Sequence, residues 1–405
     1  MLRRATRVVT KEISGLQPMD QVVDGTDEEA DFLTLLNVAE RGDAKARREA
    51  LEELGNTSLY YIPTPNLQEV LDRLMNLASD PVIQAISLTV LALQARELAR
   101  PGEMIPRGYR EKLVDHFLRF AQESYARTCE ASASSLGTIG PIIPAPRREE
   151  VVAHLMNLSH SAAPETRKAA AGALSALASI VPDSPPYNRV ISIIPEQLIG
   201  NVARRLLELT QDADIGVATT AVTSLGMMQE SIQVALQPEV LEKILRLLGH
   251  QDARVREAAI FSLGKLDFLI PEERLRQYAA ALLDLTHDPS HDVRGHALSS
   301  WFWGQNRVPE DLLRIVVRRI LETSRDVDPL LRRYALSSFV SINFRDRVPI
   351  DMIPELSDRL VDLLTDPDES TRTYSRHALE HYRTILPVER RESIEKALER
   401  TRVHF

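Results

Sequence analysis

The chain lacks several features that stabilise or anchor other classes of protein. Its 405 residues include one cysteine, Cys129, so no disulfide can form within the chain. No apolar run reaches the ~18 residues of a transmembrane helix. The first residues, MLRRATRVVTK, are basic but lack the apolar core of a signal peptide. These absences predict a cytoplasmic protein, with a transit peptide as the alternative for the basic start.

The chain also lacks the charge and the motifs of several functional classes. Its formal net charge of −9 argues against a broad surface for phosphate backbones, although a local basic stripe would still be compatible with it. The sequence contains no nucleotide-binding Gly loop and no nucleophile elbow. Aromatic residues make up only 5% of the chain, as expected where alanine and leucine make the contacts between helices.

One stretch, residues 251–266 (QDARVREAAIFSLGKL), sets a pattern that recurs along the chain. An Asp-bearing turn comes first, and apolar residues then line one face of a helix while Arg256 stands beside the first of them. About nine such units, with a period near ~40 residues, are typical of a helical repeat protein. The positions that align with Arg256 are Arg47, Gln84, Arg127, Arg167, Ala218, Arg294, Arg332 and Arg372.

These units resemble the HEAT repeats, including the PBS-lyase-like subgroup with its D-x-x-V-R-x-x-A-x-x-x-L-G pattern. The resemblance is strongest over residues 210–386 and extends over residues 151–180. It implies an all-α fold, a right-handed α-solenoid of about nine HEAT-like helical hairpins. The family spans scaffolds, adaptors, lyases and hydroxylases, so the resemblance predicts architecture and not activity.

The starts of the helices carry recognisable signals. First helices should open at Pro271 and Pro309, where acidic residues follow and suit the positive end of a helix dipole. Second helices should open at Asp-Pro pairs, with Asp at the N-cap and Pro at the first helical position. These pairs are Asp80-Pro81, Asp288-Pro289, Asp328-Pro329 and Asp366-Pro367.

The breaks in the pattern predict five segments. They are a mobile arm over residues 1–27, about four repeats over 28–181, a Pro-rich insertion over 182–195, about five repeats over 196–386, and a capping helix over 387–405. The insertion is either a binding loop or a hinge, since solenoid insertions fall in loops on one face. The last helix is charged and would keep the end of the array soluble.

The repeated arginines form the most visible constellation. One interpretation is a ladder for an acidic ligand. The favoured one is structural, with each arginine paired to an Asp in a neighbouring turn, because the planar guanidinium can bond a carboxylate and a carbonyl together. The predicted structural ladder consists of Arg127, Arg167, Asp252, Arg256, Asp292, Arg294, Asp328, Arg332, Asp366 and Arg372.

An aromatic cluster at Trp301, Phe302 and Trp303 interrupts the pattern. Successive helical positions are ~100° apart, so three bulky rings cannot all face one core. They form either an interface anchor or a cluster covered by the following loop. Solenoids usually bind their partners on the exposed side of the second helices. Residues of that side and the aromatic cluster together form the predicted partner-binding set: Trp301, Phe302, Trp303, Arg333, Ser337, Arg376 and His377.

Two groups of histidines have spacings that could hold a metal, but they are interpreted as capping or surface residues. His377 and His381 lie four apart on a helix, and His287, His291 and His296 form a second group. Bare spacing is a weak signal, and a site needs at least three converging ligands. HEAT-fold hydroxylases use repeated His-Glu pairs, which this chain lacks. The sequence therefore predicts no metal, no cofactor and no catalytic residue.

The favoured hypothesis is a non-catalytic scaffold or adaptor that binds a protein partner through its concave face. One alternative is a lyase-like or other enzyme subunit that holds a small ligand in the same groove. The other alternative is nucleic-acid binding through an Arg-rich C-terminal groove. The negative net charge of the chain argues against this alternative.

Overall fold

The computed structural model describes residues 25–57, 64–97, 105–122, 125–179, 192–303, 308–341, 346–386 and 388–402, without the side chains of 25–29, 64–66, 230, 301–303, 389 and 402. Helices dominate this part of the chain, and none of it is β-strand. The predicted all-α solenoid is confirmed. Most of the predicted arm (1–27) and of the insertion (182–195) lies outside the described residues.

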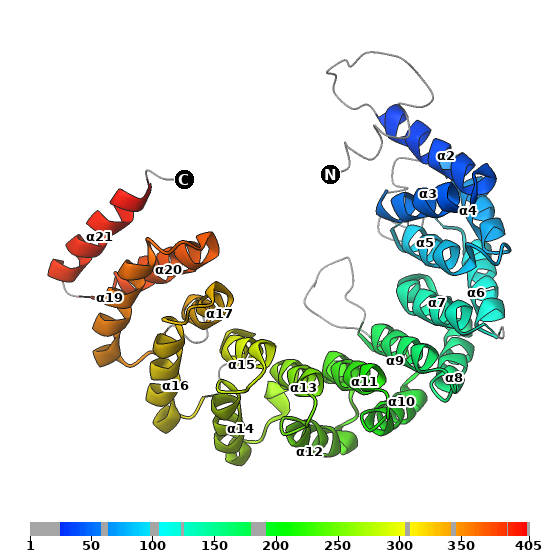
Figure 1. Cartoon of the computed structure of the whole chain (residues 1–405). Coiled ribbons are helices and arrows are strands. Elements are labelled where there is room, and N and C mark those ends of the chain that lie inside the picture. The colour runs from blue at the N-terminus through cyan, green and yellow to red at the C-terminus, as the bar shows by residue number, and fades with distance from the viewer. Residues whose placement is uncertain are drawn as a thin grey trace. The chain divides into compact units, whose positions relative to one another are not determined.

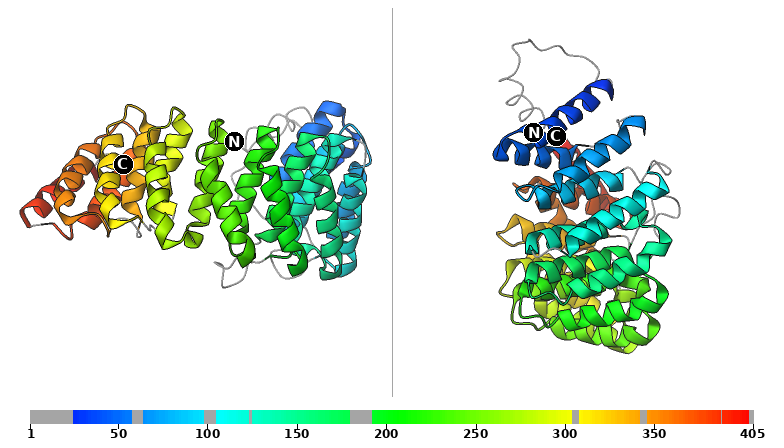
Figure 2. Two further views of the ribbon diagram at one scale, coloured as in Figure 1. Left: turned by 90° about the horizontal axis from the view of Figure 1, so that it is seen from below. Right: turned by 90° about the vertical axis from the view of Figure 1, so that its right-hand side faces the viewer.

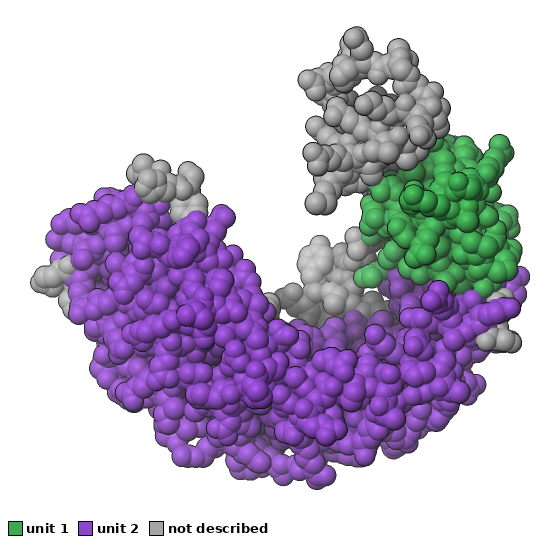
Figure 3. Space-filling model, in the orientation of Figure 1, with its two compact units in different colours: residues 1–98 green, residues 99–405 purple. Residues whose placement is uncertain are grey.

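The chain divides into two compact units, residues 1–98 and residues 99–405 (Figure 3). Unit 1 holds two hairpins. Their helices are α2 (Gly25–Arg41), α3 (Ala44–Asn56), α4 (Thr64–Leu77) and α5 (Gln84–Glu97).

Unit 2 holds seven further hairpins and a final helix in its described part. The first helices of its hairpins are α6 (Arg107–Ala121), α8 (Arg148–Leu158), α10 (Glu196–Leu209), α12 (Gln237–Leu247), α14 (Glu272–Leu285), α16 (Glu310–Thr323) and α19 (Ile353–Leu363). The second helices are α7 (Ala126–Thr138), α9 (Pro164–Ala178), α11 (Ile215–Met228), α13 (Ala253–Lys265), α15 (His291–Trp303), α17 (Pro329–Val340) and α20 (Glu369–Tyr382). Helix α21 (Val388–Arg402) follows.

The hairpins of unit 2 stack side by side in sequence order (Figures 1 and 2). Second helices line the inner, concave side of this row, and first helices line its outer side (Figure 1). Each second helix contacts the next second helix along the row. One hairpin cannot bury its own apolar face, so the stacking creates the continuous core of the unit.

Small residues allow the second helices to approach closely. A Cβ atom at Gly137 would lie 2.8 Å from the Cα of Ala173, and one at Gly226 would lie 2.6 Å from the Cα of Ser262. Serine hydroxyls also cross these contacts, as where Ser262 Oγ donates to the Val222 carbonyl at 2.8 Å. Close packing on one side of a row of hairpins bends the row toward that side, which accounts for the concave inner side of unit 2.

The predicted starts of the first helices are confirmed. Pro271 and Pro309 are the N-cap residues of α14 and α16, and acidic residues open both helices. The prediction for the second helices is right only at Asp328, the N-cap of α17, whose side chain accepts from the Leu330 N–H.

At the other Asp-Pro pairs the predicted helix start is wrong. Helix α20 is capped by Asp368, two residues after Asp366, and α15 begins at His291, three residues after Asp288. Asp366 and Asp288 instead accept backbone N–H groups two residues further on, from Asp368 and Ser290. This local turn leaves each carboxylate facing the neighbouring hairpin.

Candidate interaction surface

The exposed side of the second helices in unit 2 forms a surface that we call the inner face. On α13 the buried residues face the neighbouring helices, and Arg254, Glu257, Phe261 and Lys265 form a stripe at helical spacing on the opposite side. Phe261 is 39% exposed. The Lys265 ammonium lies 5.6 Å from the centre of the Phe261 ring, so a cation covers part of an exposed aromatic face.

The inner face changes in character along the row. The positions equivalent to Phe261 on the other second helices of hairpins α8–α17 are Gly172, Thr223, Ser299 and Ser337, of which Ser299 and Ser337 are buried. Small side chains therefore flank Phe261 on both neighbouring helices, so its ring protrudes from the inner face.

A second aromatic group lies further along the inner face. A Cβ atom at Gly295 would lie 2.5 Å from the Tyr334 ring, so the ring of α17 rests directly on the backbone of α15. The rings of His296 and Tyr334 are 6.0 Å apart, and the Nδ1 of His296 lies 2.9 Å from the Asp292 carbonyl oxygen. Any side chain larger than glycine at position 295 would displace Tyr334.

The predicted partner-binding residues are placed unequally. The side chains of Trp301, Phe302 and Trp303 lie outside the described residues. Arg333 and the exposed His377 lie on the second helices, whereas Ser337 is only 9% exposed and donates to the Tyr334 carbonyl. Arg376 donates to the Leu398 carbonyl and to the Thr401 hydroxyl, so α21 engages this guanidinium.

Two of the histidines contact aspartates from other segments of the chain. His291 Nε2 lies 2.6 Å from an Asp328 oxygen, and His381 Nε2 lies 3.0 Å from an Asp346 oxygen. Within the described ranges, no group of three or more His, Cys, Asp or Glu side chains is placed to hold a metal ion. The same residues include no helix with the length and apolar character needed to cross a bilayer.

The arginine ladder holds the turns of neighbouring hairpins together. Arg256 Nη1 donates to the His250 and Gln251 carbonyls of its own turn at 2.7 and 3.0 Å. Its Nε and Nη2 donate to both oxygens of Asp288 in the next turn, at 2.8 and 2.7 Å. The two side chains are only 11% and 7% exposed, so this fork is largely removed from water. Burial by itself would raise the pKa of Asp288, but the bonds from Arg256 and the Ser290 N–H hold that pKa below its ordinary value.

Equivalent pairs occur elsewhere in the row. Arg167 binds Asp212 in the same bidentate manner at 2.8 and 2.7 Å, and Arg332 binds Asp366 at 2.6 Å. In unit 1, Arg47 binds Asp80 at 2.6 Å. Arg294 and Arg372 hold the two carbonyls of their own turns in the same way.

The ladder uses different Asp residues from those predicted, with Asp366 as the exception. Asp252 and Asp328 cap their own helices, and Asp292 is exposed on α15. Each turn has two positions for Asp, two residues apart. The earlier one receives the arginine of the preceding hairpin and the later one caps the helix, as Asp212 and Asp214 show.

The register of α7 also differs by two residues from the prediction. Ser132 donates to the Phe117 carbonyl as Ser375 does to the Leu360 carbonyl, and Gly137 approaches Ala173 as Gly226 approaches Ser262. Both equivalences place the buried Cys129, and not Arg127, at the ladder position. Arg127 is exposed and makes no ion pair with any described residue.

The outer layer contains arginines that sequence reasoning missed. Arg205 reaches back to the preceding first helix and donates to the carbonyl of Ser159, the C-cap residue of α8, at 2.6 Å. Arg319 does the same to Thr286 at 2.8 Å, and Arg359 to Ser324 at 2.6 Å. We call these three residues the outer clamps. Each stands five residues before the C-cap of its own helix, a spacing that an alignment of the first helices could have shown.

Other charges of the outer layer are also paired between hairpins. Arg147 binds Asp115 at 2.7 Å, Arg314 binds Asp351 at 2.7 Å, and Arg390 binds Asp358 at 2.7 Å. Further pairs join Arg274 to Glu242 and Arg276 to Asp311. Much of the charge on the outer surface is therefore neutralised within the chain.

Comparison with known proteins agrees with this geometry. Residues 202–300 match a family model described as HEAT repeats. The predicted HEAT repeats are confirmed. A search of curated protein sequences returned no match.

Solved structures with the same arrangement are solenoids of the HEAT and armadillo type. Kap95p bound to RanGDP matches with a TM-score of 0.59 and 17% identity, over 90% of this chain and 47% of that one. A Kap121p mutant matches with a TM-score of 0.58 and 15% identity, over 87% and 37%. The Kap95:Nup1 complex matches with a TM-score of 0.55 and 15% identity, over 90% and 47%. At these identities the likeness establishes the fold of the HEAT repeats.

Proposed function

We propose that this HEAT-repeat chain is a non-catalytic scaffold or adaptor that binds a segment of a protein partner along the inner face of unit 2. The observation that carries the proposal is Phe261, an aromatic side chain 39% exposed at a position where the flanking helices carry Thr223 and Ser299. Exposed aromatic residues among small neighbours are typical anchors of protein interfaces.

The distribution of charge supports the same surface. Outer-layer arginines are used to join hairpins, whereas on the inner face Lys168 is exposed and makes no ion pair with any described residue. Arg333 makes a long contact of 3.5 Å to the Ser370 hydroxyl and no ion pair with any described residue. Cations that the fold does not use remain available to acidic groups of a partner.

The lining of the inner face favours a polypeptide segment as the occupant. Small side chains such as Gly172, Thr223 and Ser299 leave room for a backbone or a docked helix to lie close to the surface. Kap95p, which has this fold, is seen in complexes with Ran and with Nup1. A protein segment that places an apolar side chain against Phe261 and carboxylates near Lys265 and Arg333 fits this surface.

Peptide selection on the full chain tests the proposal. A displayed library of random peptides is panned on the protein, and the recovered peptides are synthesised and titrated by fluorescence anisotropy. Phe261→Ala should weaken their binding by about thirtyfold, as loss of an interface anchor does. Arg333→Glu should weaken the peptides that carry acidic residues.

A matched control is available in the same chain. Phe268 is 38% exposed but lies in the short helix Asp267–Leu269 between α13 and α14, outside the second helices that form the inner face. Phe268→Ala should leave peptide binding unchanged. If Phe261→Ala and Phe268→Ala bind the peptides as the unmodified chain does, or if no peptide is recovered, the inner face is not the binding surface.

A further inference from the structure

The outer clamps join successive first helices at three junctions, α8/α10, α14/α16 and α16/α19. Each clamp places a planar guanidinium against the C-terminal end of the preceding first helix, where backbone carbonyls lack partners within their own helix. Arg319, for example, donates from Nε to the Thr286 hydroxyl at 2.9 Å and from Nη2 to the Thr286 carbonyl at 2.8 Å. The fork of the arginine makes both contacts at once.

The same position in α12 holds a lysine that does not clamp. Lys243 stands five residues before Leu248, the C-cap of α12, as Arg319 stands before Ser324. The C-cap residue of the preceding first helix is Thr210, the same residue type that Arg319 contacts at Thr286, the C-cap of α14. Lys243 nevertheless makes no hydrogen bond or ion pair with any residue that the structure describes.

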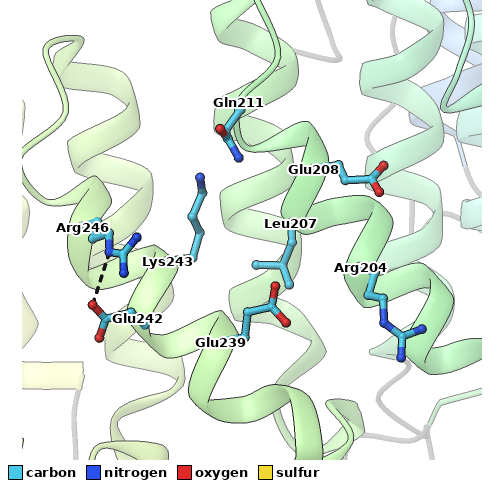
Figure 4. A pocket seen from close by; sticks show the side chains of 8 residues that line it. All are labelled: Arg204, Leu207, Glu208, Gln211, Glu239, Glu242, Lys243 and Arg246. Atoms are coloured by element: carbon cyan, nitrogen blue, oxygen red, sulfur yellow. Dashed lines mark hydrogen bonds and ion pairs between the residues drawn. The ribbon is translucent and has the colours of Figure 1, made fainter.

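A cavity of about 420 Å³ lies between α10 and α12, beside this lysine (Figure 4). Leu207 provides an apolar patch in its lining, and the other lining residues are polar or charged. The complete lining consists of Arg204, Leu207, Glu208, Gln211, Glu239, Glu242, Lys243 and Arg246. Burial and the neighbouring Arg246 lower the pKa of Lys243 from its ordinary value, so the amine is partly withdrawn from water.

Two opposite charges in this cavity remain unpaired. Glu239 and Lys243 are four residues apart on α12, in the order that favours an ion pair on a helix surface. They do not pair. Figure 4 shows the Lys243 amine near Gln211 at one end of the cavity and the Glu239 carboxylate below Leu207 at the other. Glu239, like Lys243, has no hydrogen-bonded or charged partner among the described residues.

The remaining carboxylates of the lining are already neutralised. Glu242 pairs with Arg246 and with Arg274, and Glu208 pairs with Arg205 at 2.8 Å. A ligand therefore meets Lys243 and Glu239, which have no partner among the described residues, with Leu207 between them. Arg204 also lines the cavity and donates to the Asn201 side chain at 3.1 Å, without an ion pair to any described residue. A molecule with a carboxylate at one end, an ammonium near it and a side chain has the complementary chemistry.

We propose that the cavity between α10 and α12 binds a free α-amino acid, with its carboxylate at Lys243 and Gln211, its ammonium at Glu239 and its side chain over Leu207. This site lies on the outer layer and is independent of the proposed inner-face function. The bound amino acid would occupy the space that an outer clamp fills at other junctions, and would join α10 to α12.

Calorimetric titration of the full chain with each of the twenty standard L-amino acids tests the proposal. At least one should bind, and its N-acetyl and C-amide derivatives should bind about tenfold more weakly, because each loses one charge-assisted contact. Glu239→Gln should weaken the same ligand by about tenfold. If no amino acid binds at millimolar concentration, or if a simple carboxylate binds as tightly as the amino acid, the proposal is wrong.

Two variants separate a specific site from general surface charge. Lys243→Arg should dock on Thr210 as Arg319 docks on Thr286, which would fill the cavity, abolish amino-acid binding and raise the midpoint of thermal unfolding. The control is Glu355→Gln, since Glu355 has the place in α19 that Glu239 has in α12, but Arg359 clamps that junction. Glu355→Gln should leave binding unchanged. Undiminished binding by Lys243→Arg would also overturn the proposal.

Discussion

The second helices of unit 2 meet at two kinds of junction, which alternate along the row. At α9/α11, α13/α15 and α17/α20 an Arg–Asp pair joins the turns: Arg167–Asp212, Arg256–Asp288 and Arg332–Asp366. At α7/α9, α11/α13 and α15/α17 a glycine lies against the next helix instead: Gly137, Gly226 and Gly295. One kind is held by buried charge at the edge, and the other by close contact along the helices.

Two of the three glycine junctions lack the ladder pair because other residues occupy both of its positions. At α7/α9 the two ladder positions hold Cys129 and Ser161, and at α11/α13 they hold Ala218 and His250. At these two junctions the arginine and the aspartate of the ladder pair are both replaced, so neither junction has a ladder arginine without its aspartate. At α15/α17 Arg294 is present but makes no ion pair with any described residue; no feature of the structure explains this. The comparison indicates that either a ladder pair or a close helix contact is sufficient to fix a junction.

Removal of a ladder arginine should give the largest effect. Arg256→Ala leaves the buried carboxylate of Asp288 without its cation and frees two turn carbonyls, so we expect a loss of about 3 kcal/mol in the free energy of unfolding. Urea titration followed by hydrogen exchange on peptides of α13 and α15 would measure it. Arg127→Ala, which removes an exposed arginine outside the ladder, should change stability by less than about 0.5 kcal/mol. Equal effects would mean that the ladder does not hold these junctions.

Filling a glycine contact should have the next largest effect. A Cβ atom at Gly226 would lie 2.6 Å from the backbone of Ser262, so Gly226→Ala must push α11 and α13 apart and should destabilise the chain by about 2 kcal/mol. Gly264 stands at the same position of the next hairpin, but a Cβ atom there would meet nothing within 4 Å. Gly264→Ala should therefore stabilise α13 by about 0.5–1 kcal/mol, through helix propensity alone. The two variants are compared by the same urea titration. If both raised or both lowered the free energy of unfolding, the distinction between a close helix contact at Gly226 and an open position at Gly264 would be wrong.

Acid should weaken the ladder junctions by a smaller amount. The bond from Arg167 lowers the pKa of Asp212 below its ordinary value of 3.8, and the pKa of Asp288 is also lowered. Carboxylates with lowered pKa values contribute stability that is present above the ordinary value and is lost as the pH falls through the value in the folded chain. Stability should thus decline below about pH 4.

The variant Arg256→Ala provides the control for this acid effect. Without its arginine, the pKa of the buried Asp288 should rise, because burial then acts on the carboxylate without the opposing bonds from Arg256, and the decline in stability below about pH 4 should be shallower. Urea midpoints measured for both chains between pH 7 and pH 3 give the comparison. Parallel curves would show that Asp288 does not contribute to the acid sensitivity.

The candidate interaction surface was only partly predictable. Exposed second helices were expected to carry the binding surface, and Arg333 and His377 do lie on them. Phe261 lies on the same surface but could not be singled out from the sequence, since its exposure among small residues depends on Thr223 and Ser299, which the stacking of the hairpins brings beside it. The outer clamps were missed because their partners are backbone carbonyls, which carry no sequence signature.

The sequence by itself determined the helical hairpins, their number and their period, because these follow from the local spacing of apolar residues and from the need of each hairpin to bury an apolar face. Only the tertiary structure decided which Asp each ladder arginine meets, since two Asp positions in one turn differ by the neighbour they face. It also distinguished Gly226 from Gly264, which hold the same place in the repeat, because the distance to the next helix depends on residues about forty positions away in the chain.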